Sequence, residues 1–138
     1  MKSKFGNVSV SCEIDGVEYK FKSKAEYRYA CYLEFLRLNG DILQWLYEPE
    51  IFTWTNSRGT RIRYKPDFKV LEFIGKSPCG LIEARRHWVE VKGYLDSRSK
   101  SKLRGFEKWY PQEKLVLIDS KWFRSNTKKL KGLVKGWT

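Results

Sequence analysis

The sequence predicts a single α/β domain over residues 1–138, with a central mixed β-sheet flanked by helices. Three observations support this class. Segments of alternating polar and apolar residues are interleaved with segments of helical spacing, which is the order expected of a mixed sheet with helices beside it. The chain contains no repeat, linker or low-complexity segment. Its 138 residues, 41% of them hydrophobic, suffice for one core.

The N-terminal half is expected to hold a hairpin, a helix and further strands. Asp15-Gly16 lies between two strand-like segments and favours a tight turn. Ser23 is placed to cap a helix, and Asn39-Gly40 is placed to end it. The expected elements are strands over 8–14 and 17–21, a helix from Ser23 to Asn39, strands over 43–47 and 51–55, and one long strand over 60–73.

The C-terminal half is expected to alternate strands and helices. Glycine and proline within 74–86 predict a loop or an irregular hairpin tip. The run at 114–119 is continuous and apolar, which is typical of a strand buried on both faces. The expected elements are a strand over 87–94, a helix over about 99–110 capped by Asp96 or Ser97 and ended by Pro111, a strand over 114–119, and a basic helix over 127–135 capped by Asn126.

The composition narrows the function. The chain carries 28 Lys and Arg against 16 Asp and Glu, and this net charge of +12 favours a polyanionic partner, most often nucleic acid. It has no lipidation motif, no long apolar run and no evident signal peptide, so we expect no membrane role. Cys12, Cys31 and Cys79 follow no metal-binding or disulfide pattern, which indicates a reducing cytoplasm. His87 is the only histidine, which argues against a His-based triad or a zinc site.

Three acidic residues and a lysine form the candidate catalytic set. Glu90 and Lys92 lie two apart in an alternating strand segment, so their side chains project together. Asp67 follows Pro66 in a second alternating segment, and Glu26 lies one turn into the first expected helix. Carboxylates can hold Mg²⁺ or Mn²⁺, and such an ion serves phosphodiester hydrolysis.

Each residue of the set has an expected role. Asp67 and Glu90 would ligate the metal, and the main-chain carbonyl of Val91 could reach it. Glu26 would complete the site or hold a second ion. Lys92 would orient or deprotonate the attacking water, or stabilise the charge of the pentacoordinate phosphorus.

Simpler interpretations stay open for each residue. Ser23 to Glu26 is also a capping box, and on that interpretation Glu26 only caps its own helix. The alternative for Asp67 is a turn residue after proline. The alternative for Glu90 and Lys92 is an exposed ion pair. The set of residue types in this order, with the last three on strands with apolar flanks, favours the catalytic interpretation.

Basic residues surround this set in the sequence and predict contacts to the nucleic-acid backbone, which carry no sequence specificity. A solvated charged face is the alternative. The candidate nucleic-acid-binding residues are Arg61, Arg63, Lys65, Arg85, Arg86, Arg98, Lys100 and Lys102. Among the many aromatic residues, Trp45, Phe52, Trp54 and Phe68 are assigned to the core or an interface, and His87 and the cysteines are taken as structural.

Three segments carry a resemblance to a known family: 21–26 (FKSKAE), 64–68 (YKPDF) and 89–94 (VEVKGY). They resemble the PD-(D/E)xK nuclease superfamily, and most of all small phage- and prophage-encoded endonucleases, kin to phage Holliday-junction resolvases and to transposase nuclease subunits. The resemblance implies a restriction-endonuclease-like core and metal-dependent cleavage of DNA. The segment 74–86 looks inserted relative to this pattern.

Position by position, the resemblance assigns one role to each candidate. Glu26 matches the acid of the first helix, Asp67 the acid of the "PD" pair, Glu90 the second acid and Lys92 the lysine. Lys102 falls where some members carry an accessory polar residue.

The resemblance also suggests the substrate and the assembly. Kinship favours branched DNA such as four-way junctions as the substrate. Cleavage of a junction requires two coordinated cuts, which favours a homodimer. The expected location is the cytoplasm of a bacterium or of a phage-infected host. The alternatives are a nuclease subunit of a larger transposition or phage DNA-processing complex, a non-catalytic basic nucleic-acid-binding module, and a ribosome-associated RNA-binding protein.

Overall fold

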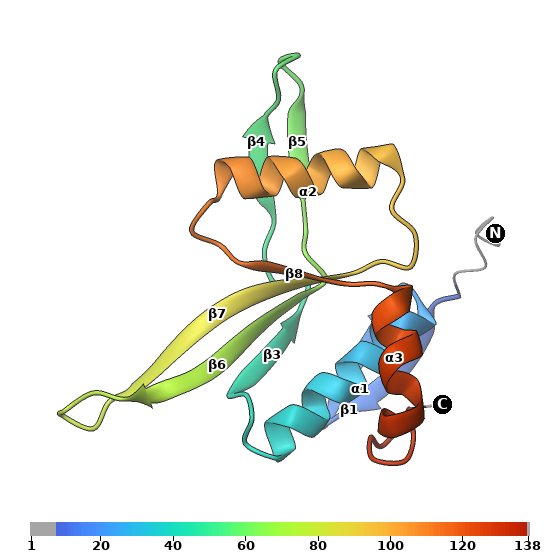
Figure 1. The fold of residues 1–138 in the computed structure, drawn as a ribbon, viewed down its shortest axis with the longest axis vertical. Coiled ribbons are helices and arrows are strands. Elements are labelled where there is room, and N and C mark those ends of the chain that lie inside the picture. Colours follow the sequence, from blue (N-terminus) through green and yellow to red (C-terminus); the bar gives the residue numbers. More distant parts are fainter. Residues whose placement is uncertain (1–7, 138) are drawn as a thin grey trace.

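The computed structural model describes residues 8–137 and has three helices arranged around a mixed sheet (Figure 1). The four-stranded sheet has the order β3-β6-β7-β8, in which β3, β6 and β7 pair antiparallel and β7 and β8 pair parallel. Hairpins β1-β2 and β4-β5 are separate two-stranded sheets. The elements are β1 (Val10–Ile14), β2 (Val17–Phe21), α1 (Lys24–Leu38), β3 (Gln44–Tyr47), β4 (Phe52–Thr55), β5 (Arg61–Tyr64), β6 (Phe68–Lys76), β7 (Ile82–Val91), α2 (Ser97–Trp109), β8 (Leu115–Ile118) and α3 (Ser120–Leu130). The expected α/β class with a mixed sheet is confirmed.

The main core lies between α1 and one face of the sheet. Val89 and Val91 point into it, as the alternation of β7 predicts, and both are buried. They meet Phe68 at the start of β6 and Leu33 of α1, both also buried. This packing fixes the inner side of β7, so that the neighbouring Glu90 must face the other way.

A second, smaller core lies on the opposite face. Trp88 of β7 is 1% exposed and packs with Trp54 and Tyr64 of the β4-β5 hairpin and with Phe106 of α2. The Tyr110 hydroxyl, after α2, donates a hydrogen bond to the Thr53 carbonyl at 2.7 Å. The hairpin and α2 are therefore anchored to each other and to the sheet on the side where Glu90 emerges.

Side-chain caps begin all three helices. The Glu26 N–H donates to Ser23 Oγ at 3.1 Å, and the Ser99 N–H donates to Asp96 Oδ1 at 2.7 Å, so both expected caps are confirmed. The third helix differs from expectation because Asp119, and not Asn126, is its cap, with the Trp122 N–H donating at 3.0 Å. It therefore begins at Ser120, and the aromatic residues of its first turns face the main core.

The long strand expected over 60–73 is two strands. β5 ends at Tyr64 and pairs with β4, whereas β6 begins at Phe68 and pairs with β3 and β7. Pro66 lacks a donor for the ladder and stands at the break. This break places Asp67 at the entrance of β6, next to the end of β7.

The remaining corrections concern the ends of strands. Of the two structures expected for 74–86, the irregular hairpin tip is confirmed: β6 and β7 pair up to Lys76 and Ile82, with a register shift between Phe73 and Gly75, so residues 82–86 belong to β7 rather than to a loop. The strand expected over 87–94 ends at Val91. The strand expected to be buried on both faces, β8, lies at the sheet edge with Leu117 37% exposed. Continuous apolar sequence therefore did not mean a central strand.

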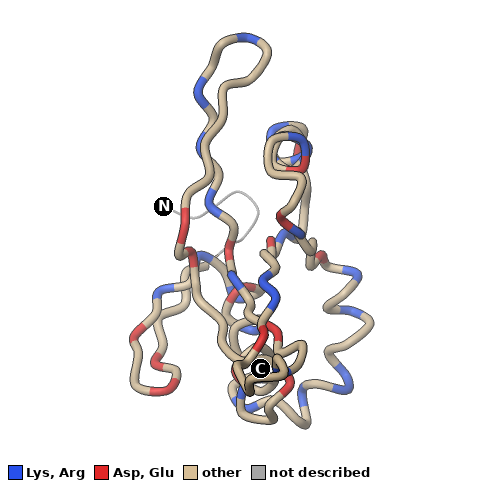
Figure 2. Tube along the Cα trace, turned by 90° about the vertical axis from the view of Figure 1, so that its left-hand side faces the viewer, with Lys and Arg blue, Asp and Glu red and all other residues tan. Residues whose placement is uncertain are grey.

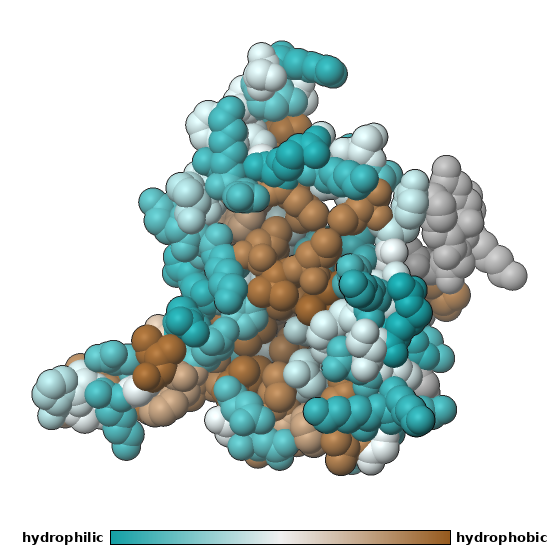
Figure 3. Space-filling model, in the orientation of Figure 1, coloured by the Kyte–Doolittle hydropathy of each residue, from teal (hydrophilic) through white to brown (hydrophobic). Residues whose placement is uncertain are grey.

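Apolar surface is visible between α2 and α3, across β8 (Figure 3). The tip of the β6-β7 hairpin also exposes large hydrophobic side chains, namely Phe73, Ile74, Leu81 and Ile82. Within 8–137, no helix combines the length and the apolar character needed to span a bilayer. The expected absence of a signal peptide concerns the first residues, of which 1–7 lie outside the described part.

Candidate functional site

The three acidic candidates come from separate elements and lie around the start of β6. Glu26 is on the first turn of α1, Asp67 immediately precedes β6, and Glu90 is on β7. Asp67 Oδ2 accepts a hydrogen bond from the Val91 N–H at 2.7 Å, which ties Asp67 to the residue after Glu90. Asp67 and Glu26 are only 2% and 5% exposed. Buried carboxylates are rare unless paired or functional, so this clustering calls for an explanation.

Glu26 serves its helix and also faces the site. Its main-chain N–H bonds the Ser23 cap, whereas its Oε1 accepts the Lys22 N–H at 3.2 Å and the Tyr47 hydroxyl at 2.6 Å. A capping box would direct the carboxylate to the N–H of the cap residue itself. Here it bonds the residue before the cap and reaches across to β3, so helix capping alone does not describe Glu26.

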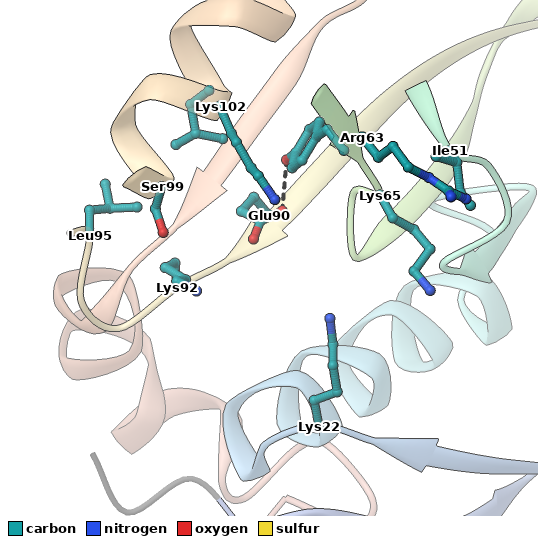
Figure 4. Close-up of a pocket in the computed structure, with 11 residues that line it drawn as sticks. Lys22, Ile51, Arg63, Lys65, Glu90, Lys92, Leu95, Ser99 and Lys102 are labelled. Atoms are coloured by element: carbon teal, nitrogen blue, oxygen red, sulfur yellow. Dashed lines mark hydrogen bonds between the residues drawn. The ribbon is translucent and has the colours of Figure 1, made fainter. Parts of the chain in front are cut away.

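Glu90 lies in an open cleft of about 410 Å³, which Figure 4 shows. Its Oε1 accepts the Tyr64 hydroxyl at 2.7 Å. Lys102 of α2 points toward Glu90, and Lys92 lies on the same wall two residues along the chain (Figure 4). The other basic residues of the cleft are Lys22, Arg63 and Lys65. Glu90 is the only acidic residue lining the cleft within the described chain.

The carboxylates repel one another electrostatically. Burial, then the charges of Glu90 and Glu26, raises the pKa of Asp67 to about 8. Burial also raises the pKa of Glu90, although the Tyr64 hydroxyl and the Lys22 and Lys92 charges act in the opposite direction. Glu90 and Glu26 both act to raise the pKa of Asp67, and Glu26 also acts to raise that of Glu90, which indicates that the three carboxylates lie near one another.

A lysine that the sequence did not single out partly neutralises this region. Lys22 Nζ lies 2.9 Å from Glu48 Oε2 and 3.7 Å from Asp67 Oδ1. Burial acts to lower the pKa of Lys22, but the bond to Glu48 and the charges of Asp67 and Glu26 outweigh it and raise that pKa. The ammonium group therefore supplies positive charge beside the acidic cluster.

Glu48 is held in an unusual backbone conformation. Its φ is +46°, in the left-handed region that non-glycine residues seldom adopt. Its N–H donates to the Asp67 carbonyl oxygen at 2.8 Å, which joins the end of β3 to the start of β6. Lys65 Nζ also approaches Glu48 Oε1, at 3.8 Å. The turn thus presents a fourth carboxylate to the lysines of the cleft.

The oxygen atoms of the cluster are the kind of ligand that a hard divalent cation prefers, but their spacing is not that of a formed metal site. Asp67 and Glu90 offer carboxylate oxygens, and Val91 directs its N–H, and with it its C=O, toward the Asp67 side of β7. Within residues 8–137, no group of three or more His, Cys, Asp or Glu side chains has metal-binding spacing. The mutual repulsion of Asp67 and Glu90 is the property that a cation would relieve.

Seven of the eight predicted nucleic-acid-binding residues fall into three groups, and Lys100 belongs to none of them. Arg63, Lys65 and Lys102 line the cleft. Arg61 and Arg98 line an adjoining groove between the β4-β5 hairpin and α2, whereas Lys100 lines neither.

Arg85 and Arg86 form the third group and lie on β7 rather than in a loop. Arg85 Nη2 is 3.0 Å from Glu72 Oε2, and Arg86 is paired with Glu113. Neither lines the cleft or the groove, because the register of β7 against β6 places them along the long hairpin.

Sequence reasoning missed Lys22, Tyr47, Glu48 and Tyr64. Tyr64 lies three residues before Asp67, a spacing that strand alternation assigns to opposite faces, so strand periodicity gave no signal for it. Lys22 and Glu48 meet only through the tertiary fold, and no local pattern marks their ion pair. The hydroxyls of Tyr47 and Tyr64 act by positioning Glu26 and Glu90.

Comparison of this chain with protein-family models, with curated proteins and with solved structures gives no significant match. The functional interpretation therefore depends on the geometry and charges described above.

Proposed function

We propose that this protein is a metal-dependent endodeoxyribonuclease with a restriction-endonuclease-like core of the PD-(D/E)xK type. One observation carries the proposal: the buried Glu26 and Asp67 gather next to the half-buried Glu90, which lines a cleft whose other charged residues are basic. Buried like charges cost stability, and functional sites are where such arrangements concentrate.

The metal would be held by oxygen atoms of the cluster. Asp67, Glu90 and the Val91 carbonyl are the ligands we assign, with Glu26 completing the site. Bound Mg²⁺ or Mn²⁺ supplies neutralisation of phosphoryl charge and a more acidic water. The Val91 N–H and the Tyr64 hydroxyl each hold one oxygen of a carboxylate, which orients the remaining oxygens.

The lysines of the cleft act on the substrate. Lys92 directly follows β7 and lines the cleft together with Glu90, so its ammonium group is placed to orient the attacking water or to stabilise charge on the phosphoryl oxygens. Lys22, Lys65 and Lys102 line the same space and are suited to bind the flanking phosphates. Branched DNA is the substrate class we propose, cut by a homodimer.

Cleavage assays with matched variants test this proposal. Asp67→Ala and Glu90→Ala should abolish cutting of plasmid or four-way DNA in Mg²⁺ while DNA binding stays equal or becomes tighter. Removal of either carboxylate takes away a ligand and also reduces repulsion of phosphate. EDTA should stop the unaltered protein. Full activity of either variant, or cutting that persists in EDTA, would rule out the proposed mechanism.

A non-catalytic nucleic-acid-binding module is the second candidate. It is favoured by the Lys22 ammonium group, which already neutralises part of the acidic cluster, and by the absence of an assembled metal group within 8–137. This candidate predicts binding with no cutting under any metal condition, and no effect of Mg²⁺ on thermal stability. The nuclease predicts the opposite in both assays.

A further inference from the structure

A groove of about 950 Å³ lies beside the cleft, between the β4-β5 hairpin and α2. Arg63 and Lys102 line both spaces, so the groove and the cleft are continuous. Figure 2 shows basic residues along the hairpin and on α2, which is seen end on. The groove is further lined by Arg58, Arg61, Arg98, Arg104, Lys108 and Trp109.

The charge of this groove is of one sign. Within residues 8–137, no Asp or Glu lines it. No ion pair in that range joins any of its arginines or lysines to a carboxylate, in contrast to Arg85, Arg86 and Arg37, which are all paired. Uncompensated cations in a concave surface produce a focused positive potential. Such a surface fits a chain of phosphates better than it fits a single small anion.

A contact between α2 and the β4-β5 hairpin forms the floor of the groove. Gly105 of α2 lies against the Trp54 indole, and a Cβ added at Gly105 would meet Trp54 Cζ2 at 2.5 Å. Trp54 is itself buried, so it cannot move aside easily. The two walls therefore touch at their base and bound one continuous concave space of about 950 Å³.

An exposed aromatic residue completes the groove. Trp109 ends α2, is 50% exposed and has Lys108 Nζ 5.4 Å from its ring centroid. Exposed indoles beside cations are stacking platforms for unpaired bases, whereas a duplex hides its base faces. The aromatic group and the free cations therefore indicate the same ligand.

We propose that the groove between the β4-β5 hairpin and α2 binds an unpaired DNA strand, the single-stranded arm of a branched substrate that leads into the cleft. The proposal builds on the proposed nuclease function and specifies its substrate. Arg58, Arg104 and Lys108 hold the phosphates of this arm, and Trp109 stacks on one of its bases. A fully paired duplex reaches the cleft alone and lacks these contacts.

A binding assay tests the groove without requiring cutting. Fluorescence anisotropy in EDTA would compare a labelled duplex with the same duplex carrying an unpaired arm of about ten nucleotides, on either strand end. The test variant is Arg58→Gln/Arg104→Gln/Lys108→Gln. The control is Lys121→Gln/Lys128→Gln/Lys129→Gln on α3, which removes the same charge from exposed positions away from the groove.

We expect the unaltered protein to bind the forked probe at least about tenfold more tightly than the duplex, and the groove variant to lose this preference. The slope of log K against log salt should fall by about two for three lost single-strand phosphate contacts. Trp109→Leu should weaken binding of the forked probe alone. The α3 control should keep the preference.

Two results would overturn the groove assignment: unchanged preference in the groove variant, or equal losses in the groove and control variants. These outcomes are separate from the nuclease question. If the protein cuts DNA in an Asp67-dependent way but binds forked and duplex DNA equally, only the groove proposal is rejected. If the protein binds forked DNA more tightly than duplex through the groove but never cuts it, only the nuclease proposal is rejected.

Discussion

Replacing Asp67 by asparagine should change how the stability of the metal-free protein depends on pH. The folded-state pKa of Asp67 is raised from 3.8 to about 8 by burial and by Glu90 and Glu26. Between these values the folded protein keeps a proton that the unfolded chain releases. The free energy of unfolding of the unaltered protein therefore falls as pH rises through this range.

The size of the effect follows from one proton. Each fully linked proton changes the free energy of unfolding by about 1.4 kcal/mol per pH unit. Asparagine does not titrate, yet its side-chain oxygen can still accept the Val91 N–H. From about pH 5 to about pH 7, Asp67→Asn should therefore gain up to about 3 kcal/mol relative to the unaltered protein.

Urea unfolding in EDTA, followed by circular dichroism and by tryptophan fluorescence, measures this difference. Glu113→Gln is the matched control, because the hydrogen bond from Arg86 lowers the pKa of Glu113 and no histidine contributes to that shift. The ionised carboxylate of this residue stabilises the fold fully at any pH above the ordinary glutamate pKa. The difference in free energy of unfolding between the control variant and the unaltered protein should therefore stay constant over the same range. Parallel pH profiles for Asp67→Asn and the unaltered protein would refute the electrostatic account of the cluster.

Three further predictions concern single residues. Lys92→Ala should reduce the cleavage rate by about 10²–10³-fold without loss of metal binding, as measured by single-turnover kinetics; a rate equal to that of the unaltered protein would exclude Lys92 from the reaction. Glu26→Gln keeps an oxygen for the Tyr47 hydroxyl, so it should lose activity while its melting temperature stays unchanged; retained activity would make Glu26 a structural cap. Gly105→Ala should destabilise the protein by about 1 kcal/mol in urea unfolding, because overpacking against Trp54 costs about 1–3 kcal/mol and the gain in helix propensity is about 1 kcal/mol. Stabilisation by this substitution would show that α2 does not lie against the hairpin.

Local patterns predicted most elements of the fold. Ser23 and Asp96 cap their helices as expected, and the alternation around Val89 correctly placed Val89 and Val91 in the core. The errors arose where a tertiary partner decided the outcome. The segment around Pro66 reads as one alternating strand, but its two halves pair with different strands. The apolar run of β8 suggests a central strand, yet among residues 8–137 no strand pairs with its outer side.

The sequence predicted the acidic residues and the lysine of the candidate site, but it did not predict which residues pair with them. Asp67 immediately precedes β6, and Glu90 lies on β7, the strand that pairs with β6. The sequence showed runs of basic residues, but it did not show which of these residues lie around Glu90. Arg85 is close to Glu90 in sequence and belongs to the hairpin, whereas Lys22 is distant in sequence and lines the cleft. Strand register and long-range ion pairs set these positions, and neither leaves a local signature.

Direct titration with Mn²⁺, followed by electron paramagnetic resonance of the free ion, tests most directly whether the acidic cluster is a cation site. We predict saturable binding to the unaltered protein and to Glu113→Gln, and its loss in Asp67→Asn and Glu90→Gln. Binding should release protons, because the carboxylates whose pKa values are raised must ionise to hold the ion. Equal Mn²⁺ binding by Asp67→Asn and the unaltered protein would contradict the account.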